Sequence, residues 1–465
     1  MMHTMDHDST ADDLAGMSVA VIGLGASGAS AARLALAKGG DVYVSDLRTD
    51  PSTAARGADL EAAGARVELG RHDLDRLAEA GIVVVSPGIP PDAPVLRDLS
   101  LRGIRWISEP ELAVRFYKGP LIAVTGTNGK TTTTLLVAHL LEAAGLEAAA
   151  GGNVGGGLAP AASDLALLDR VPAWYVLEMS SFQLAGIDRF RPNIGVVTNL
   201  SPDHLDRYES VDAYYADKAR LFANAGRESI WVLPYGDAAV AGLAGNAPGA
   251  RYRFGGSGEP GTHAFVREGV LSLRLDDEEE PLIAEAELPL LGRHNVLNAL
   301  TAALVARLAG AGTESIVAGL RTARALPHRM EPVLDRHGVL WVNDSKATNV
   351  AATSSALASL DRPIVALLGG KDKGEPFGLL APLLTDRARA VIAFGAAGAR
   401  IADELGSVGA VERMGDDFRA VLERAAEVAL TGDVVLLSPA CSSFDMFDDY
   451  EHRGRTFTEI AREVA

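Results

Sequence analysis

The chain has 465 residues, 22% of them charged, and a formal net charge of −18. Because a domain commonly takes about 150 residues, this length excludes a single core and predicts three domains. The excess of acidic residues excludes a protein whose main task is to hold a nucleic-acid backbone. The single cysteine, Cys441, excludes an internal disulfide and a thiolate zinc cage and favours a reducing compartment.

Residues 1–16 are acidic and lack the apolar run of a signal peptide or membrane anchor, so we expect a disordered tail. The rest of the sequence contains no run of about 18 uninterrupted apolar residues, which argues against a transmembrane helix. We therefore expect a cytoplasmic monomer with no membrane insertion and no nucleic-acid partner.

Residues 17–117 are predicted to form a Rossmann-like domain. Short β-rich runs, SVAVIG, DVYVSD and GIVVVSP, alternate with Ala- and Leu-rich helical stretches. This alternation is typical of a parallel sheet covered by helices.

A second α/β domain is predicted over residues 118–326. Gly119-Pro120 ends the helical stretch EPELAVRFYK, and a buried strand then leads into VTGTNGK. The strands WYVLEM and IGVVTNL follow. From about Arg251 to Leu291 polar and apolar residues alternate, as they do in antiparallel hairpins, and a helix in HNVLNALTAALVARLAG closes the domain.

Residues 327–465 are predicted to form a Rossmann-like C-terminal domain. The strands VLWVNDS, PIVALLGG, AVIAFG and DVVLLSP are each followed by a helical pattern. The predicted fold class is therefore α/β with three domains, of which the central one is a P-loop-type ATP-binding domain with an antiparallel portion.

A glycine-rich loop follows the first predicted strand. Gly23-x-Gly25-x-x-Gly28 opens a helix, and Asp46 ends the next strand. Such glycines let the backbone approach a pyrophosphate at a helix N-terminus, while the acid can hydrogen-bond a ribose. The context predicts a diphosphate-containing nucleotide, which can be NAD or a UDP-linked ligand. A tight turn needed only for packing is the alternative.

A second loop, VTGTNGKTTTT at residues 124–134, also lies between a buried strand and a helix. Its glycine spacing is two residues shorter than that of the usual G-x-x-x-x-G-K-[ST] loop. Backbone amides at the turn, the Lys130 ammonium and the Thr131 hydroxyl are nonetheless the three elements that a triphosphate with Mg²⁺ requires. ATP binding is therefore predicted, with a Thr-rich helix cap as the alternative. One loop for a nucleotide substrate and one for an energy source indicate a ligase.

The loop GTNGKTTT resembles that of the Mur ligases and folylpolyglutamate synthases, in which the short spacing is normal. SPGIP, LEMSSFQL, NLSPDHLDRY, GRHNVLNALTA, PHRMEPV, NDSKATN, LLGGKDKG and SPACSSFDMF follow in the order of that family. From about residue 17 to the C-terminus the chain is similar to the D-glutamate-adding Mur ligases. The resemblance implies an ATP- and Mg²⁺-dependent amide ligase that joins D-glutamate to UDP-N-acetylmuramoyl-L-alanine in peptidoglycan precursor synthesis, through an acyl phosphate and a tetrahedral intermediate.

The same resemblance implies four catalytic residues: Lys130, Glu178, His204 and Lys218. It makes Thr131 and Glu178 ligands of a Mg²⁺ beside the phosphates and His204 a ligand of a second Mg²⁺, and it adds Lys218 to the metal ligands if CO₂ carbamylates that side chain. The alternatives are an acid that caps the SSFQ turn for Glu178, a turn or core histidine for His204, and a solvated lysine for Lys218.

ATP is expected on the phosphate loop and on polar residues of later motifs. Asn295 and Asn298 share roughly one helix face and can reach an adenine or its ribose, or else they cap the helix. The resemblance directs Arg329 to the γ-phosphate and Asp344 to the ribose, against the alternative of an ordinary salt bridge. The full expected ATP set is Gly126, Thr127, Asn128, Gly129, Lys130, Thr131, Thr132, Asn295, Asn298, Arg329 and Asp344.

The UDP-linked substrate is expected at the first loop and at the carboxyl ends of the neighbouring strands. This set comprises Gly25, Ala26, Ser27, Gly28, Ser45, Asp46, Arg48, Ser86 and Gly88. The resemblance adds Asn153 near the reacting carboxylate, where the alternative is a turn asparagine with positive φ.

D-glutamate is expected in the C-terminal domain. The resemblance places Thr348, Lys373, Ser443, Phe444 and Tyr450 around its carboxylates, with Lys346 adding positive charge. A lysine with amides and hydroxyls suits a dicarboxylate. Since GKDKG differs from the usual GDGK-like segment, either Lys371 or Lys373 makes the contact.

Other functions explain fewer motifs. An NAD-dependent oxidoreductase explains GLGASG and Asp46 but not GTNGKTTT or NDSKATN, and a non-catalytic nucleotide sensor needs no acceptor pocket. A diaminopimelate- or lysine-adding ligase is expected to carry a motif such as DNPR, which the sequence lacks, and folylpolyglutamate synthases lack the GLGASG domain. We also expect the C-terminal domain to close over the central one when ligands bind.

Overall fold

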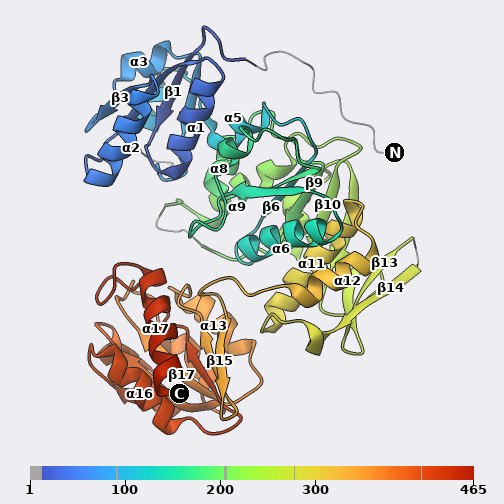
Figure 1. Ribbon diagram of the computed structural model, residues 1–465, viewed down its shortest axis with the longest axis vertical. Helices are drawn as coiled ribbons and strands as arrows, with labels where there is room; N and C mark the ends of the chain where they lie inside the picture. Colours follow the sequence, from blue (N-terminus) through green and yellow to red (C-terminus); the bar gives the residue numbers. More distant parts are fainter. Residues whose placement is uncertain (1–12, 91–92, 204–206, 277, 410) are drawn as a thin grey trace. The chain divides into compact units, whose positions relative to one another are not determined.

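The structure, a computed structural model, describes residues 13–90, 93–203, 207–276, 278–409 and 411–465. The chain forms two compact units. The first runs to Ile283 and includes Leu297–Gly319, and the second comprises Ala284–Val296 with Leu320–Ala465. Three sheets with flanking helices make up these units, as Figure 1 shows along the chain. The α/β class with three domains is thus confirmed.

The N-terminal sheet is entirely parallel, in the order β3-β2-β1-β4-β5. Its elements are β1 (Ser18–Ile22), α1 (Ala26–Ala37), β2 (Asp41–Asp46), α2 (Pro51–Ala62), β3 (Arg66–Leu69), α3 (Leu74–Glu79), β4 (Ile82–Val85), α4 (Pro94–Leu101) and β5 (Ile107–Ser108). Side chains alternate along each strand, so β1 sends Val19 and Val21 toward α1 and α2, and Ala20 and Ile22 toward α3 and α4. The helices therefore cover both faces.

Leu14 is ordered, although it falls in the tail that we expected to be disordered. Its side chain is buried in the same hydrophobic cluster as α1, and its N–H donates a 2.7 Å hydrogen bond to the Lys38 carbonyl. Burial of this leucine offsets the entropy lost when the residues before β1 become ordered. Residues 1–12 of that tail lie outside the described residues.

The central sheet is mixed, in the order β14-β13-β12-β11-β10-β9-β6-β8-β7. Its elements follow the linking helix α5 (Glu109–Val114): β6 (Leu121–Thr125), α6 (Lys130–Ala143), β7 (Ala148–Gly152), α7 (Ala162–Leu165), β8 (Trp174–Glu178), α8 (Ser181–Ala185), β9 (Ile194–Val197), α9 (Val211–Ala219), β10 (Ile230–Pro234), α10 (Ala238–Ala244), β11 (Ala250–Phe254), β12 (Ala264–Arg267), β13 (Val270–Leu275) and β14 (Glu278–Ala284). α11 (Arg293–Leu308) and α12 (Thr313–Thr322) follow. One hydrophobic cluster runs from β1 and α1 through Phe116 and Tyr117 into β6 and β8, so the first two sheets share a core.

The antiparallel portion starts later than we predicted. β11, at the start of the stretch expected to form hairpins, pairs in parallel with both β10 and β12. The reason is the crossover helix α10, which returns the chain to the starting edge of the sheet. β12 and β13 are antiparallel, with Ala264 opposite Leu273.

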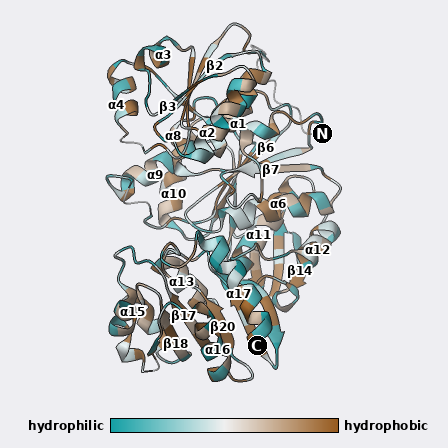
Figure 2. Cartoon of the chain, turned by 60° about the vertical axis from the view of Figure 1, so that its left-hand side comes forward, coloured by the Kyte–Doolittle hydropathy of each residue, from teal (hydrophilic) through white to brown (hydrophobic). Residues whose placement is uncertain are grey.

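The C-terminal sheet has the order β15-β16-β20-β17-β18-β19, and only β15 pairs antiparallel to its neighbour. Its elements are β15 (Glu331–Arg336), β16 (Val339–Asn343), α13 (Val350–Ala358), β17 (Ile364–Gly369), α14 (Ala381–Leu384), β18 (Ala388–Phe394), α15 (Gly398–Glu404), β19 (Val411–Arg413), α16 (Phe418–Val428), β20 (Val434–Leu437) and α17 (Tyr450–Val464). Figure 2 shows β17, β18 and β20 as hydrophobic strands, as expected for strands with both faces covered. α16 and α17 pack on one face, and α13 and α15 pack on the other.

Candidate functional site

The first glycine loop forms one wall of a pocket of about 440 Å³ in the N-terminal domain. Seven expected substrate residues line this pocket: Gly25, Ala26, Ser27, Asp46, Arg48, Ser86 and Gly88. Gly28 does not line the pocket. It packs against the loop backbone, since a Cβ atom at this position would lie only 1.8 Å from the Gly23 carbonyl oxygen. Ser45 is buried and its hydroxyl bonds to Nδ1 of His72 at 2.8 Å.

Asp46 holds the loop in place. Its Oδ2 accepts a 2.6 Å hydrogen bond from Leu24 N–H, and its Oδ1 accepts one of 2.8 Å from Arg48 N–H. Burial acts to raise the pKa of Asp46, but hydrogen bonds from Arg48 and Leu24 outweigh it, so the pKa lies below its ordinary value. The ionised carboxylate thus links the glycine loop to the cation beside the pocket.

The shortened phosphate loop is tied to the end of the neighbouring strand β9. Thr127 N–H donates to the Asn199 carbonyl at 2.9 Å, and the Thr198 hydroxyl donates to the Asn128 carbonyl at 2.7 Å. Gly129, with φ of +79°, makes the turn into α6. Lys130 folds back so that its Nζ donates to the Thr127 carbonyl at 2.8 Å. Thr131 and Thr132 begin α6.

Glu178 and Asn153 meet at the carboxyl edge of the same sheet. Glu178 ends β8 beside Val124 of β6, and it is only 2% exposed. Asn153 Nδ2 donates to Glu178 Oε1 at 3.1 Å. Glu178 Oε2 is buried and has no hydrogen-bond partner among the described residues, which leaves one carboxylate oxygen available for a cation.

Lys218, on α9, is buried and not solvated. It is 1% exposed, its Nζ donates to the Gly126 carbonyl at 2.8 Å, and the same atom lies 4.7 Å from the ring centroid of Tyr214. Burial, and then the positive charge of Lys130, hold the pKa of Lys218 well below its ordinary value. The neutral amine is therefore more accessible here than at an exposed lysine.

The expected Mg²⁺ ligands are only partly within the described residues. His204 lies outside them, and the parts of the chain that are described contain no ready-made group of three His, Cys, Asp or Glu side chains for a metal. The oxygen of Glu178 and the hydroxyl of Thr131 nevertheless suit a hard cation such as Mg²⁺. These two oxygen donors therefore fit the Mg²⁺ that is expected with a triphosphate on the phosphate loop.

The two asparagines of α11 make separate contacts. Asn298 Oδ1 accepts a hydrogen bond from the Thr133 hydroxyl at 3.3 Å. The same oxygen lies so close to Gly129 that a Cβ atom there would be only 2.4 Å away. The Asn298 side chain therefore packs directly against the phosphate loop. Asn295 Nδ2 donates to the Leu291 carbonyl at 2.8 Å. Both side chains are buried.

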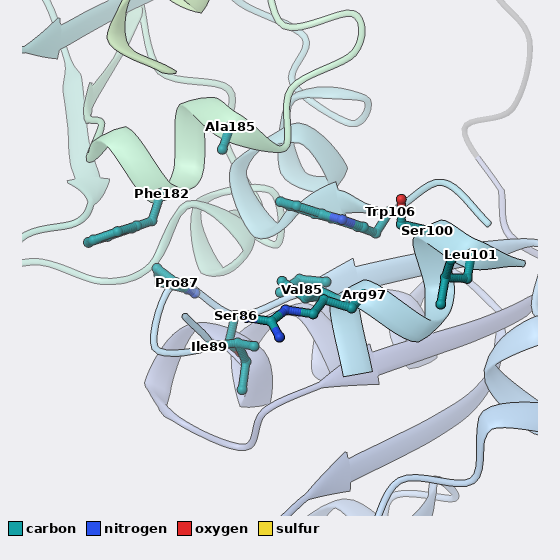
Figure 3. A pocket seen from close by; sticks show the side chains of 11 residues that line it. Val85, Ser86, Pro87, Ile89, Arg97, Ser100, Leu101, Trp106, Phe182 and Ala185 are labelled. Atoms are coloured by element: carbon teal, nitrogen blue, oxygen red, sulfur yellow. The ribbon is translucent and has the colours of Figure 1, made fainter. Parts of the chain in front are cut away.

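A second pocket, of about 570 Å³, shares Ser86, Pro87 and Ile89 with the pocket at the first glycine loop. Figure 3 shows Trp106 and Phe182 on one side of it and Val85 and Arg97 on the other. This pocket was not predictable from local sequence, because its walls come from segments about eighty residues apart in the chain.

Arg207 is a further residue near this pocket that was not predicted from the sequence. Its guanidinium lies 4.3 Å from the Phe182 ring centroid, and its Nη2 donates to the Gly88 carbonyl at 2.9 Å. It connects the NLSPDHLDRY motif to the SPGIP motif. Both motifs were signals in the sequence, but the arginine within the first was not singled out.

In the second unit, Asp344 is buried and holds the segment that carries Arg329. Its Oδ1 accepts from Met330 N–H at 3.1 Å, and its Oδ2 accepts from the Ser438 hydroxyl at 2.8 Å. Burial raises the pKa of Asp344 to about 7. The positive charge of Arg329 acts in the opposite direction.

The residues expected around D-glutamate lie in the segments that follow β16, β17 and β20, and Tyr450 begins α17. Lys373 Nζ donates to the Thr348 hydroxyl at 3.3 Å, and Lys346 Nζ lies 3.9 Å from the Tyr450 ring centroid. The Lys371 backbone is instead paired with Ser442. Ser443 is buried, whereas Phe444 is 68% exposed.

The sequence matches three family models. These are the Mur ligase MurD-like N-terminal domain over residues 17–108, the Mur ligase middle domain over 124–306, and the Mur ligase glutamate ligase domain over 328–441. No helix in the described part of the chain has the length and apolar character to cross a membrane.

Two curated relatives match over nearly their whole lengths. The UDP-N-acetylmuramoylalanine–D-glutamate ligase of Acidobacterium capsulatum is 41% identical over 453 residues, covering 96% of each chain. That of Koribacter versatilis is 40% identical, covering 97% of this chain and 99% of the relative. Among solved structures, a pseudomurein peptide ligase type C from Methanothermus fervidus shares the fold, with a TM-score of 0.60 at 21% identity, covering 97% of this chain and 100% of that one. The chain belongs to the Mur ligase family.

Proposed function

We propose that this chain is a ligase that joins D-glutamate to UDP-N-acetylmuramoyl-L-alanine with hydrolysis of ATP to ADP and phosphate. The observation that carries the proposal is the match to D-glutamate ligases over 96% of the chain. The geometry of the two loops agrees with it, since the first unit contains a nucleotide pocket and a phosphate loop. Membership of the Mur ligase family implies the use of ATP and Mg²⁺.

The reaction has two steps. The substrate carboxylate attacks the γ-phosphorus of ATP, which gives an acyl phosphate and ADP. The D-glutamate amine then attacks the acyl carbon, and the tetrahedral intermediate expels phosphate to leave an amide. The first step depends mostly on positioning and charge neutralisation, and the second needs the amine held against the acyl carbon.

For the first step, the loop amides, Lys130 and Thr131 would hold the triphosphate. Lys130 already lies over the loop, on the Thr127 carbonyl, and would exchange that contact for phosphate oxygens. The free Oε2 of Glu178, together with Thr131, would hold a Mg²⁺ that neutralises charge on the phosphates, and His204 would be a ligand of a second Mg²⁺. Asn295, Asn298, Arg329 and Asp344 would complete the ATP contacts.

Carbamylation of Lys218 fits its environment. A neutral amine is the nucleophile that CO₂ requires, and burial lowers the pKa of this amine, which shifts it toward the neutral form. The product is an anion with two oxygens, which would add a second acidic ligand beside Glu178, where the described residues contain no ready-made group of three His, Cys, Asp or Glu side chains. The negative charge would also offset the positive charge of Lys130 nearby.

The pocket at the GLGASG loop would hold the UDP portion of the substrate. Arg48 and the amides of α1 suit a diphosphate, and Asn153 would face the reacting carboxylate from the central sheet. In the second unit, Lys373 and Thr348, which contact each other, would bind a carboxylate of D-glutamate together with Ser443, Phe444 and Tyr450. The contact with Thr348 favours Lys373 over Lys371. We further propose a cytoplasmic monomer with 17–117, 118–326 and 327–465 as its domains.

The test is phosphate release from ATP with UDP-N-acetylmuramoyl-L-alanine, comparing D-glutamate, L-glutamate, meso-diaminopimelate and no amino acid, with the product identified by mass spectrometry. Turnover with D-glutamate alone, and a product heavier by one glutamyl residue, is expected. Turnover with another amino acid would overturn the acceptor assignment and leave the ligase class intact, whereas no turnover with any of them would overturn the function.

A further inference from the structure

Arg453, on α17, is fully buried in the second unit, with 0% of its surface exposed. Its guanidinium reaches three different segments. Nε donates to the Ser345 hydroxyl at 3.0 Å, and Nη2 donates to the Ser345 carbonyl at 2.9 Å. Nη2 also donates to the Cys441 carbonyl at 3.1 Å, and Nη1 donates to the Gly369 carbonyl at 3.4 Å. One side chain thus joins the carboxyl ends of three strands, β16, β17 and β20.

The charge of Arg453 has no counter-ion close by. All of the guanidinium's hydrogen bonds go to a carbonyl or a hydroxyl, and no ion pair joins it to a carboxylate in the described part of the chain. After burial, the groups that act on its pKa are Cys441 and then Asp445, and the Asp445 carboxylate already accepts the Ala396 N–H at 2.9 Å. Burial lowers the pKa of Arg453 to about 10, so the side chain stays charged at neutral pH. A buried cation without a partner is costly, which points to a role beyond packing.

The segments that Arg453 joins are those that carry the expected acceptor residues. Ser345 lies in the NDSKATN motif ahead of Thr348, Gly369 precedes the GKDKG loop with Lys373, and Cys441 precedes Ser443. Tyr450 stands one turn earlier on α17, and its carbonyl accepts the Ser345 hydroxyl at 2.8 Å. The Ser345 hydroxyl therefore lies between Arg453 and Tyr450.

The backbone around the guanidinium is shaped to admit it. Gly370 has φ of +128°, and a Cβ there would lie 2.2 Å from the Ser442 carbonyl oxygen and 3.0 Å from Arg453 Nη1. The adjacent Lys371 forms a backbone bridge with Ser442. The GKDKG loop and the SPACSS segment are thus held together directly above the arginine.

We propose that Arg453 is a positioning residue for the acceptor amino acid: it fixes the three segments of the pocket and supplies a buried positive charge that favours a dicarboxylate. This inference rests on the proposed function. In a protein interior a charge acts over longer distances than in water, because the effective dielectric constant is lower. The two carboxylates of D-glutamate would provide the negative charge that the described residues do not place beside the guanidinium.

The test compares Arg453→Met, which removes the charge, with Arg453→Lys, which keeps the charge but lacks the forked set of N–H donors of the guanidinium. Arg462→Met, an exposed arginine on the same helix, is the matched control. For each protein the KM values for D-glutamate, ATP and UDP-N-acetylmuramoyl-L-alanine are measured with kcat and the melting temperature. Trapping of the acyl phosphate with borohydride, in the absence of D-glutamate, reports the first step alone.

For Arg453→Met we expect KM for D-glutamate to rise at least about tenfold, a free-energy change of about 1.4 kcal/mol, with KM for ATP and acyl phosphate formation unchanged. Arg453→Lys should recover part of this loss, and Arg462→Met should behave as wild type. Because Arg329 and Asp344 lie in the same unit, general damage to that unit would raise KM for ATP equally, and this outcome overturns the proposal. A folded Arg453→Met with wild-type KM for D-glutamate, or a lysine variant no better than the methionine variant, also overturns it. Absence of D-glutamate-dependent turnover in the wild type would instead overturn the proposed function.

Discussion

The Nζ atom of Lys218 lies 2.8 Å from the carbonyl oxygen of Gly126 and donates a hydrogen bond to it. Gly126 is the first glycine of the phosphate loop, so the buried lysine supports the loop from below. Its low pKa, caused by burial and by Lys130, gives this amine two properties at once. Under the proposed carbamylation it would react with CO₂, and after reaction it would place an anion beside the phosphates.

Replacement of Lys218 by alanine is expected to lower kcat by about 10²-fold or more, as is typical when a preorganised electrostatic group is removed from an active site. The proposal of carbamylation adds a sharper expectation: wild-type activity should fall after exhaustive removal of CO₂ and return with bicarbonate, and the intact mass should show the addition of one CO₂. Lys118→Ala, at an exposed lysine, is the control. Full activity of the CO₂-depleted wild type would refute carbamylation while leaving the structural contact to Gly126 in place.

Asn153 is expected to act on Mg²⁺ through Glu178. Its amide fixes Oε1 at 3.1 Å and leaves Oε2 free. Removal of such an outer hydrogen bond typically weakens a metal site by about 10–100-fold. Asn153→Ala should therefore raise the Mg²⁺ concentration needed for half-maximal activity by about that factor, with a smaller effect at saturating Mg²⁺. Asn246→Ala, at an exposed asparagine, should leave the Mg²⁺ titration unchanged, and an unchanged titration for Asn153→Ala would contradict the role.

The two glycine loops were predictable because each follows a short apolar strand and opens a helix, a pattern that depends on local sequence alone. The parallel pairing of β11 was not, because strand direction depends on how α10 carries the chain across the sheet. Arg453 shows the same limit for the site. An arginine in a charged helix is ordinarily solvated, and only the tertiary structure reveals that this one is fully buried beneath three strand ends.

Asp46 is expected to control affinity for the UDP-linked substrate. Its carboxylate ties the Leu24 amide to Arg48, so Asp46→Asn would keep one acceptor but lose the ion pair. We expect KM for that substrate to rise about tenfold, in the usual range for the loss of a charged hydrogen bond, with KM for ATP unchanged. Asp41→Asn, at the exposed start of the same strand, is the matched control. If both substitutions gave wild-type KM values, Asp46 would be a loop residue without influence on the substrate.

Glu109 gives a prediction about stability and pH. This glutamate begins α5, between the N-terminal and central sheets, and it is 0% exposed. Its Oε1 accepts a hydrogen bond from Ser163 N–H, and its Oε2 has no partner among the described residues. Burial raises the pKa of Glu109 from 4.5 to about 7, against the hydrogen bonds from Ser163. The folded state therefore favours the protonated carboxyl.

Proton linkage gives the direction in which folding stability changes with pH. Between pH 4.5 and pH 7 the folded protein retains a proton on Glu109 that the unfolded chain has lost, so stability falls as pH rises through this window. The loss amounts to about 3 kcal/mol at most and is complete above the folded pKa. Glu109→Gln cannot ionise and should escape this loss. Its melting temperature relative to wild type should therefore increase from pH 5 to pH 8.

The measurement is calorimetric melting of the wild type and Glu109→Gln at several pH values, with Glu61→Gln, an exposed glutamate on α2, as the control. Asp344 also has a pKa raised to about 7 by burial, so the wild-type curve contains its contribution as well. Asp344 is present in all three proteins, and the difference between the two melting curves isolates Glu109. Curves for wild type and Glu109→Gln that stay parallel across this pH range would show that Glu109 ionises in the folded protein as readily as in the unfolded chain, and that the unpartnered Oε2 is solvated.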